Sequence, residues 1–248
     1  LIFDVDGTLA ENEQCGHRVA FNRAFEDFGL GWRWDEALYL ELLRVFGGKE
    51  RLRHFIDDLL AADQRPDDPD ALIPELHRRK TERYIELLKA GRIPLRPGVA
   101  RLIREAHAAG LGLAVASTTT LENATTLLAQ SIGPESVDWF DAFACGDVVP
   151  NKKPAPDVYL HALDQMGLDA AECMAFEDSV NGLASALAAD LQTLVTVNLV
   201  TQGQDFDGAA LVLDGLGEPG QPFTVMAGDA GESRWVDLAL LRRLHQRC

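Results

Sequence analysis

The chain has 248 residues, of which 47% are hydrophobic and 25% charged, and its formal net charge is −16. This composition excludes membrane-spanning, collagenous and disordered classes of protein. A strongly acidic surface repels phosphate backbones, so neither nucleic acid nor a membrane is an expected partner.

An apolar strand opens the chain, and helices follow it. Residues 1–9 are typical of a short buried strand that ends in Asp4-Val5-Asp6-Gly7-Thr8. Because the chain begins inside this apolar run, we expect residues to precede Leu1. The next apolar residues recur at helical spacing in stretches formed by Phe21, Phe25 and Phe28, by Leu38, Leu42 and Val45, by residues 52–60, and by a segment ending near Lys89. A helical domain is therefore predicted over residues 11–89.

From Pro94 onward, strands and helices alternate. We expect strands at 111–116, 142–145, 174–176, 191–197 and 210–213, and helices at 97–109, 121–130, 154–166 and 179–188. This alternation predicts an α/β fold with a Rossmann-like parallel sheet as its core, built from residues 1–10 and 90–248. A helical cap domain inserted after the first strand lies at the sheet edge where α/β folds bind ligands. Residues 203–235, rich in Gly and Asp, have the pattern that is hardest to interpret.

The cysteines are scattered along the chain. Cys15, Cys145, Cys173 and Cys248 form no Cys-x-x-Cys pair. This disfavours a zinc site and a disulfide framework and favours a reducing compartment.

Polar side chains occur where the predicted strands end or a helix begins. Each has a plain structural explanation, namely an Asp-Gly turn, a helix N-cap or a solvated lysine. Paired carboxylates at a strand end also suit a nucleophile, a general acid and a hard-metal site. Their occurrence in this order favours one joint site over separate caps. The residues are Asp4 and Asp6, then Ser117 and Thr118, then Lys153, and finally Glu177 and Asp178.

These four motifs together resemble the haloacid-dehalogenase superfamily of aspartate-nucleophile phosphotransferases, and the insert resembles the helical cap of that superfamily. Segments 13–22, 34–35, 47–51 and 147–150 are similar to the CbbY proteins, which are sugar-bisphosphate phosphatases close to β-phosphoglucomutase. The resemblance implies hydrolysis of xylulose-1,5-bisphosphate, a Rubisco inhibitor, to xylulose 5-phosphate in the Calvin cycle. We accordingly expect a monomer with a small sugar bisphosphate as its partner. Its expected location is the bacterial cytoplasm, or the chloroplast stroma in a plant.

The resemblance also implies roles for the core residues. Asp4 is the nucleophile that forms an aspartyl-phosphate, and Asp6 is the general acid and base. Ser117, Thr118 and Lys153 hold phosphoryl oxygens. Mg²⁺ is the implied cofactor, with Asp4, the Asp6 main-chain carbonyl, Asp178 and, directly or through water, Glu177 as its ligands. Many relatives carry Asn or a basic residue just after the Ser/Thr, whereas this chain has threonines there.

Candidate substrate residues lie in the insert. Lys49 and Arg51 follow a glycine turn at Gly48 that lets the backbone approach an anion, so we expect them to clamp the second phosphate of the substrate. The structural alternative is a pair of solvated cations at a helix start. Glu13 and His17 are expected to bind sugar hydroxyls, although His17 alone is also typical of an ordinary surface or core histidine.

Other functions stay open beside the phosphatase. A β-phosphoglucomutase-type mutase retains the aspartyl-phosphate until the sugar re-docks, and the core motifs do not separate it from a phosphatase. A dehalogenase is disfavoured because it needs neither Asp6 as acid and base nor a metal, whereas Lys49 leaves a phosphonate hydrolase open. A non-catalytic sugar-phosphate binding module is disfavoured because Asp4 and Asp6 are both present.

Overall fold

The computed structural model describes residues 1–45 and 47–246. Cys248, one of the cysteines considered above, lies outside the described residues. The contacts within the chain divide it into two compact units. One is the helical unit, residues 12–93, and the other is the sheet unit, residues 1–11 with the described residues from 94 onward. Among the described residues, no helix has the length and apolar character needed to cross a membrane.

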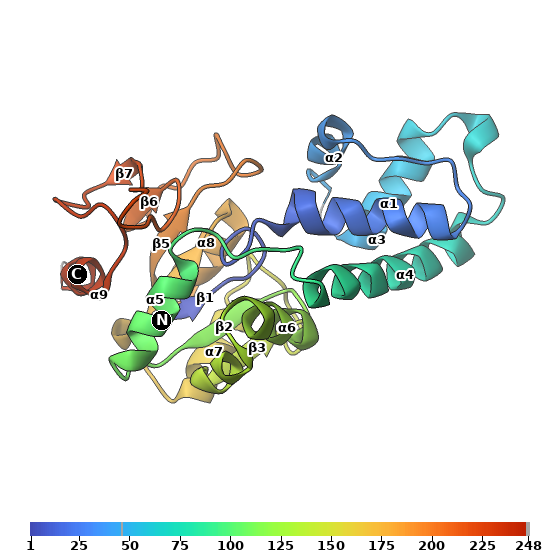
Figure 1. Ribbon diagram of the computed structural model, residues 1–248. Helices are drawn as coiled ribbons and strands as arrows, with labels where there is room; N and C mark the ends of the chain where they lie inside the picture. Colours follow the sequence, from blue (N-terminus) through green and yellow to red (C-terminus); the bar gives the residue numbers. More distant parts are fainter. Residues whose placement is uncertain (46, 247–248) are drawn as a thin grey trace. The chain divides into compact units, whose positions relative to one another are not determined.

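The sheet unit contains a seven-stranded sheet in the order β3-β2-β1-β4-β5-β6-β7 (Figure 1). All pairs are parallel except β6 and β7. Since β1 lies between β2 and β4, the carboxyl ends of these three strands are neighbours at one edge. The predicted α/β fold with a parallel sheet core and inserted helices is therefore confirmed. The strands are β1 (Ile2–Phe3), β2 (Ala114–Ser117), β3 (Ala142–Cys145), β4 (Met174–Glu177), β5 (Gln192–Thr196), β6 (Leu211–Leu213) and β7 (Val225–Gly228).

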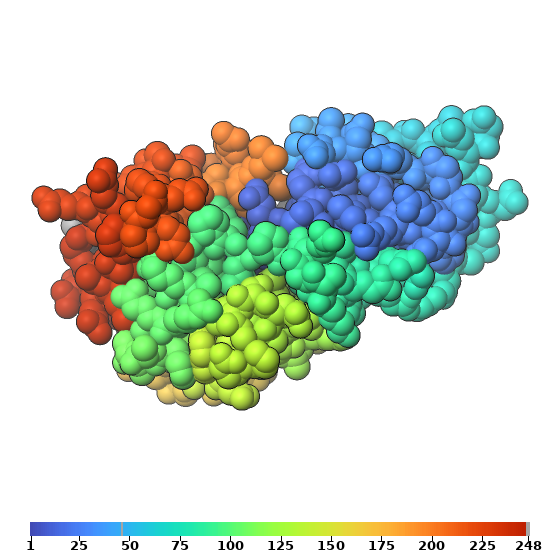
Figure 2. Space-filling view, in the orientation of Figure 1, coloured from blue at the N-terminus to red at the C-terminus, as the bar shows by residue number. Residues whose placement is uncertain are grey.

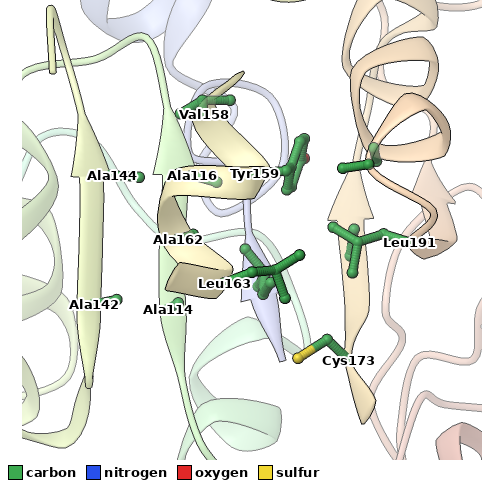
Figure 3. Close-up of a cluster of buried hydrophobic side chains, with 14 residues drawn as sticks. Ala114, Ala116, Ala142, Ala144, Val158, Tyr159, Ala162, Leu163, Cys173 and Leu191 are labelled. Carbon is green, nitrogen blue, oxygen red and sulfur yellow. The ribbon is translucent and has the colours of Figure 1, made fainter. Parts of the chain in front are cut away.

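Small side chains on β2 and β3 let a helix pack closely against the sheet. Ala114 and Ala116 on β2 and Ala142 and Ala144 on β3 are buried under Tyr159 and its neighbours on α7 (Figure 3). This close packing holds α7 against β2 and β3. The helices of this unit are α5 (Val99–Ala108), α6 (Leu121–Ser131), α7 (Asp157–Met166), α8 (Val180–Ala188) and α9 (Leu238–His245).

The helical unit has an aromatic core. Phe21, Phe25, Trp34, Tyr39 and Phe55 are all buried in one cluster. Its longest helix, α4, packs along α1 (Figures 1 and 2). The elements are α1 (Arg18–Asp27), α2 (Glu36–Leu42), α3 (Gly48–His54) and α4 (Pro69–Lys89), with π-helical turns at Glu13–His17 and Phe55–Leu59.

Several predicted boundaries were wrong. The helix expected from residue 154 begins at Asp157, because Pro156 occupies its N-cap. Phe28, expected on a buried stripe, is 39% exposed because α1 has already ended at Asp27. The apolar stretch over 52–60 is divided between α3 and a π-helical turn. The segment 203–235, where only the strand at 210–213 was predicted, also contains β7.

Candidate functional site

Three buried carboxylates gather at the carboxyl end of the central strands. Asp4 directly follows β1, Glu177 ends β4, and Asp178 comes next. The Asp4 main-chain N–H donates to the Phe176 carbonyl at 3.0 Å, which continues the pairing of the two strands. One carboxylate oxygen of each acidic residue lies within 4.8 Å of the others. Strand pairing thus brings Asp4 close to Glu177 and Asp178, which are neighbours in the sequence but at least 173 positions away from it.

Lys153 bridges two of these carboxylates. Its Nζ donates to Asp4 Oδ1 at 2.8 Å, to Glu177 Oε1 at 2.5 Å and to the Ala116 carbonyl at 2.9 Å. The side chain is only 9% exposed, which rules out the solvated-lysine explanation. Tyr159, on α7, donates its hydroxyl to the same Glu177 oxygen at 2.6 Å. Glu177 therefore holds Lys153 in place, since its Oε1 accepts from both donors.

Burial dominates the electrostatics of the acidic group. It raises the pKa of Asp4 to about 7, although Lys153 opposes the shift, and Glu177 and Asp6 add to it. Burial also raises the pKa of Asp178 well above its usual range, and the Asp4 and Glu177 carboxylates push in the same direction. Asp178 has a neutral donor, Asn198 Nδ2 at 2.6 Å, where Asp4 has a lysine. The three carboxylates carry more negative charge than the single lysine offsets. Oxygen ligands of this kind suit a hard divalent cation.

The segment after Asp4 folds back as a tight turn beside Asp178. Gly7 N donates to the Ala10 carbonyl at 2.8 Å, and the half-buried Asp6 forms a bridge with Ala10. Gly7 has φ of +88°, and a Cβ at this position would collide with the Asp178 carboxylate. Glycine is therefore required here both by its backbone conformation and by the closeness of Asp178.

Ser117 ends β2, next to β1, and is buried. Its Oγ accepts from Thr119 N at 3.3 Å, whereas the N-cap of α6 is Thr120. The N-cap explanation for Ser117 is thus excluded. Thr118, predicted beside it, is exposed, and Thr119 is the buried neighbour instead. Thr119 Oγ1 accepts from Asn123 Nδ2 at 3.3 Å. An asparagine side chain therefore lies beside the threonines that follow Ser117.

Ser179 and Asp178 differ in whether they cap the helix that follows them. Ser179 is the N-cap of α8, and its Oγ accepts from Gly182 N at 3.1 Å. Asp178 is not the cap, so its burial beside Asp4 has no explanation in helix capping.

Within the helical unit, Glu13 and Arg51 meet through a tyrosine. Tyr39 donates its hydroxyl to Glu13 Oε2 at 2.6 Å, and Arg51 Nη1 donates to that hydroxyl at 3.1 Å. Arg51 Nε donates to the Leu42 carbonyl at 3.2 Å, and the guanidinium carbon lies 5.3 Å from the centre of the Tyr39 ring. These contacts hold a buried guanidinium in one orientation.

His17 belongs to a second polar group of the helical unit. Its Nδ1 lies 2.8 Å from Lys80 Nζ, and its ring stacks on Tyr84 with centroids 4.1 Å apart. Lys80 is 9% exposed and its Nζ lies 5.1 Å from the centre of the Phe21 ring. The histidine is therefore neither a free surface residue nor an apolar core residue.

Lys49 and Arg51 do not lie together. Residues two apart on a helix point to different faces, and Lys49 is exposed on α3 where Arg51 is buried. Lys49 lines a hollow of about 500 Å³ with a mixed set of charges that includes Glu50, Asp57 and Asp70. The two cations of the clamp expected from the sequence therefore lie on different faces of α3, and the clamp itself stays a prediction. Gly48 packs against His77, whose Nε2 would lie 2.7 Å from a Cβ at that position.

Sequence reasoning missed several members of these groups. In the sheet unit they are Arg96, Thr119, Asn123, Tyr159 and Asn198, and in the helical unit Tyr39, His77, Lys80 and Tyr84. Lys80 lies within a long helix beside the exposed Arg78 and the partly exposed Arg79, so spacing alone gives it no distinct signal.

Comparison with known proteins gives a consistent result. A profile of the haloacid dehalogenase-like hydrolases matches residues 1–190. A CbbY protein of Cupriavidus necator is 47% identical over 245 residues, which cover 99% of this chain and 96% of the relative. A CbbY variant from Rhodobacter sphaeroides, crystallised in complex with xylulose-1,5-bisphosphate, superposes with a TM-score of 0.76 at 43% identity, covering 86% of this chain and 92% of that one.

A more distant structure has the same fold. A putative β-phosphoglucomutase from Thermotoga maritima matches with a TM-score of 0.64 at 25% identity and covers 82% of this chain and 87% of that one. The identity to the CbbY proteins is thus nearly twice that to the mutase-like structure. From the profile match and the near-complete coverage by CbbY relatives, the chain belongs to the haloacid dehalogenase-like hydrolases and, within them, is a phosphatase of the CbbY type.

Proposed function

We propose that this phosphatase is Mg²⁺-dependent and hydrolyses one phosphate of a sugar bisphosphate through an aspartyl-phosphate on Asp4. The observation that carries the proposal is the buried group of Asp4, Glu177 and Asp178, with Lys153 bridging the first two. The ligand of the Rhodobacter sphaeroides structure makes xylulose-1,5-bisphosphate the first substrate to test. Hydrolysis of its 1-phosphate would yield xylulose 5-phosphate.

The donor set of this group fits Mg²⁺. Asp4 and Asp178 would be direct ligands, together with the main-chain carbonyl of Asp6. Glu177 already accepts hydrogen bonds from Lys153 and Tyr159, so its contribution would be through water or through the position of Lys153. When bound, the cation would reduce the repulsion between the Asp4 carboxylate and a phosphate dianion and would stabilise the charge that develops on the phosphoryl oxygens.

In the first half-reaction, Asp4 attacks phosphorus and the bond between phosphorus and the sugar oxygen breaks. Asp6 donates a proton to that oxygen, so the sugar leaves as an alcohol. Lys153 donates to Asp4 Oδ1 and thereby fixes the carboxylate for attack. Its ammonium, the Ser117 hydroxyl and the main-chain N–H groups after β2 would hold the phosphoryl oxygens.

In the second half-reaction, Asp6 accepts a proton from the water that attacks the aspartyl-phosphate. The bond between phosphorus and Asp4 then breaks, and inorganic phosphate leaves. One carboxyl group can serve both steps because the first step leaves it deprotonated and ready to act as a base.

We propose that the helical unit, residues 12–93, is the cap and recognises the rest of the substrate. Arg51 would bind the phosphate that is not transferred. Its Nε and Nη1 bond to Leu42 and Tyr39, which leaves Nη2 as the donor for a ligand. Glu13 and His17 would bind sugar hydroxyls, with Lys80 keeping His17 in position.

The test is phosphate release from a panel of sugar mono- and bisphosphates, each with Mg²⁺ and with EDTA, followed by identification of the sugar product. Fast release from xylulose-1,5-bisphosphate that EDTA stops would support the proposal. Transfer of the phosphate to another sugar position without net release would indicate a mutase. Tight binding of every sugar phosphate without turnover would indicate a non-catalytic binding module.

A further inference from the structure

Arg96 is a buried cation whose hydrogen-bond acceptors are all neutral. Nη1 lies 2.5 Å from the Gly7 carbonyl oxygen, 2.9 Å from the Thr196 carbonyl and 3.1 Å from Thr196 Oγ1. Nη2 lies 2.7 Å from the Val197 carbonyl and 2.9 Å from that of Asp214. The residue is 8% exposed. A buried guanidinium is rarely found without a carboxylate among its hydrogen-bond acceptors. The segments that carry these neutral acceptors therefore indicate what Arg96 does.

The acceptors belong to three segments, and the sheet does not join the first of them to the other two, which pair with each other. Gly7 is in the turn after β1, Thr196 and Val197 are at the end of β5, and Asp214 follows β6. Strand β1 pairs with β2 and β4, not with β5 or β6. Arg96 therefore links the turn after β1 to strands that are two and three positions away in the sheet.

The same turn is linked to Asp178 through Asn198. Asn198 Nδ2 lies 3.3 Å from the Gly7 carbonyl oxygen and 2.6 Å from Asp178 Oδ2. Arg96 and Asn198 thus converge on one oxygen, that of Gly7, and Asn198 extends the connection to an acidic residue of the central group. The Gly7 carbonyl directly follows Asp6, whose own carbonyl is a ligand in the proposed function.

We infer that Arg96 is a positioning residue for the metal site and fixes the Asp6–Gly7 turn relative to the Asp178 carboxylate. The inference rests on the proposed function, because it assumes that the group binds Mg²⁺. Replacing a residue that hydrogen-bonds to the metal ligands and orients them commonly weakens metal binding by about 10- to 100-fold. Arg96 touches neither the substrate nor the reacting atoms in this scheme, so its effect would appear in Mg²⁺ binding.

Arg101, on α5, provides a matched control. It is also an arginine with several acceptors, since it donates to the Val236 carbonyl at 2.9 Å, to the Gly217 carbonyl at 2.8 Å and to Glu218 Oε2 at 2.9 Å. None of these acceptors belongs to the turn after β1 or to the acidic group. Replacing Arg101 therefore removes a comparable set of hydrogen bonds without disturbing the proposed ligands.

The experiment compares Arg96→Met, Arg96→Lys and Arg101→Met with the wild type. Mg²⁺ affinity is measured calorimetrically in the absence of substrate, and the melting temperature is measured in EDTA. Arg96→Met should raise the Kd for Mg²⁺ by about 10- to 100-fold, and Arg101→Met by less than about twofold. Arg96→Lys keeps the charge but not the planar fork of donors, so its Kd should rise by about 3- to 10-fold. If Arg96→Met does not fold, Arg96→Lys carries the comparison.

The role as a positioning residue is overturned if the variants at both arginines lower the melting temperature while the Kd for Mg²⁺ stays at the wild-type value. It is also overturned if Arg101→Met weakens Mg²⁺ binding as much as Arg96→Met, because the effect would then be general loosening. Failure of the proposed function gives a different result, namely a wild-type protein that binds no Mg²⁺ and releases phosphate equally well in EDTA.

Discussion

Replacement of Arg51 tests recognition of the second phosphate separately from the reaction at the first phosphate. Arg51→Met keeps most of the volume of the side chain but removes its donors. A hydrogen bond from a charged donor contributes about 1.5–3 kcal/mol, which corresponds to a loss of roughly 10- to 100-fold in kcat/KM. Part of this loss should appear in kcat, because binding energy away from the reacting phosphate also orients the substrate.

The substitution has a separate structural cost. It removes two hydrogen bonds from a charged donor, each worth about 1.5–3 kcal/mol, although the Leu42 carbonyl keeps the Val45 main-chain N–H at 3.0 Å and the Tyr39 hydroxyl keeps its bond to Glu13. Kinetics must therefore be measured well below the melting temperature of the variant. Lys49→Met is the matched control, because Lys49 lies on the same helix but is exposed and makes none of these contacts.

The assay measures released phosphate from xylulose-1,5-bisphosphate and from xylulose 1-phosphate, which keeps the transferred phosphate and lacks the other one, at saturating Mg²⁺. We expect Arg51→Met to lose about 10- to 100-fold in kcat/KM on the bisphosphate and less than about threefold on the monophosphate. Lys49→Met should lose less than about threefold on both substrates. Equal losses on the two substrates with Arg51→Met would show that this cation serves only the folding of the helical unit. A large loss with Lys49→Met would refute the assignment of Arg51 as the single cation.

Three further predictions concern the nucleophile, the acid and base, and a buried histidine. Asp4→Asn should abolish turnover and leave circular dichroism unchanged, because an amide cannot form the phosphoaspartate; activity within tenfold of wild type would contradict this. Asp6→Asn should lower kcat by about 10²- to 10⁴-fold, and a change confined to KM would make Asp6 a binding residue. Burial, with Lys80 and Lys49 nearby, lowers the pKa of His77 to about 4. The unfolded chain, with a pKa of about 6.5, then binds the extra proton between these values. The free energy of unfolding should therefore fall by roughly 1–2 kcal/mol as the pH drops from 6.5 to 4, and urea titrations at pH 7.5 and 5 should show His77→Gln to have lost that part of the slope.

The fold could be predicted because its signals are local. Apolar runs with turn residues between them located β1 to β6 closely, and the helical spacing after β1 located the insert. The hairpin strand β7 was not predictable, since all four of its residues are exposed and it has no apolar alternation to detect. Helix α9 follows Asp237 as its N-cap in a segment whose preceding residues show no periodicity.

The site could be predicted where the residue type itself indicates chemistry, and not where only packing does. Asp4 and Asp178 directly follow β1 and β4, and Lys153 lies between β3 and α7. Their places in the alternation of strands and helices predicted that all three lie at the carboxyl edge of the sheet. Arg96 lies just before the first turn of α5, where an arginine ordinarily reaches solvent, and its five acceptors come from positions up to 118 residues away. The separation of Lys49 from Arg51 was also beyond spacing alone, because it depends on which face of α3 the aromatic core covers.

The charges of the two units explain why a bisphosphate would need both. In the sheet unit, Lys153 offsets one of the three buried carboxylates, and a bound divalent cation would offset the other two. The charge of Lys153 is therefore already shared by Asp4 and Glu177, and a second phosphate in the proposed function would need further positive charge. The helical unit provides such charge, since Arg51 and Lys80 are both held as buried cations against aromatic rings. A cation fixed in this way loses little side-chain entropy when an anion binds, so its contribution to recognition is larger than that of a solvated lysine. Under the proposed function, a substrate with one phosphate would need only the sheet unit, whereas a preference for two phosphates would come from the helical unit.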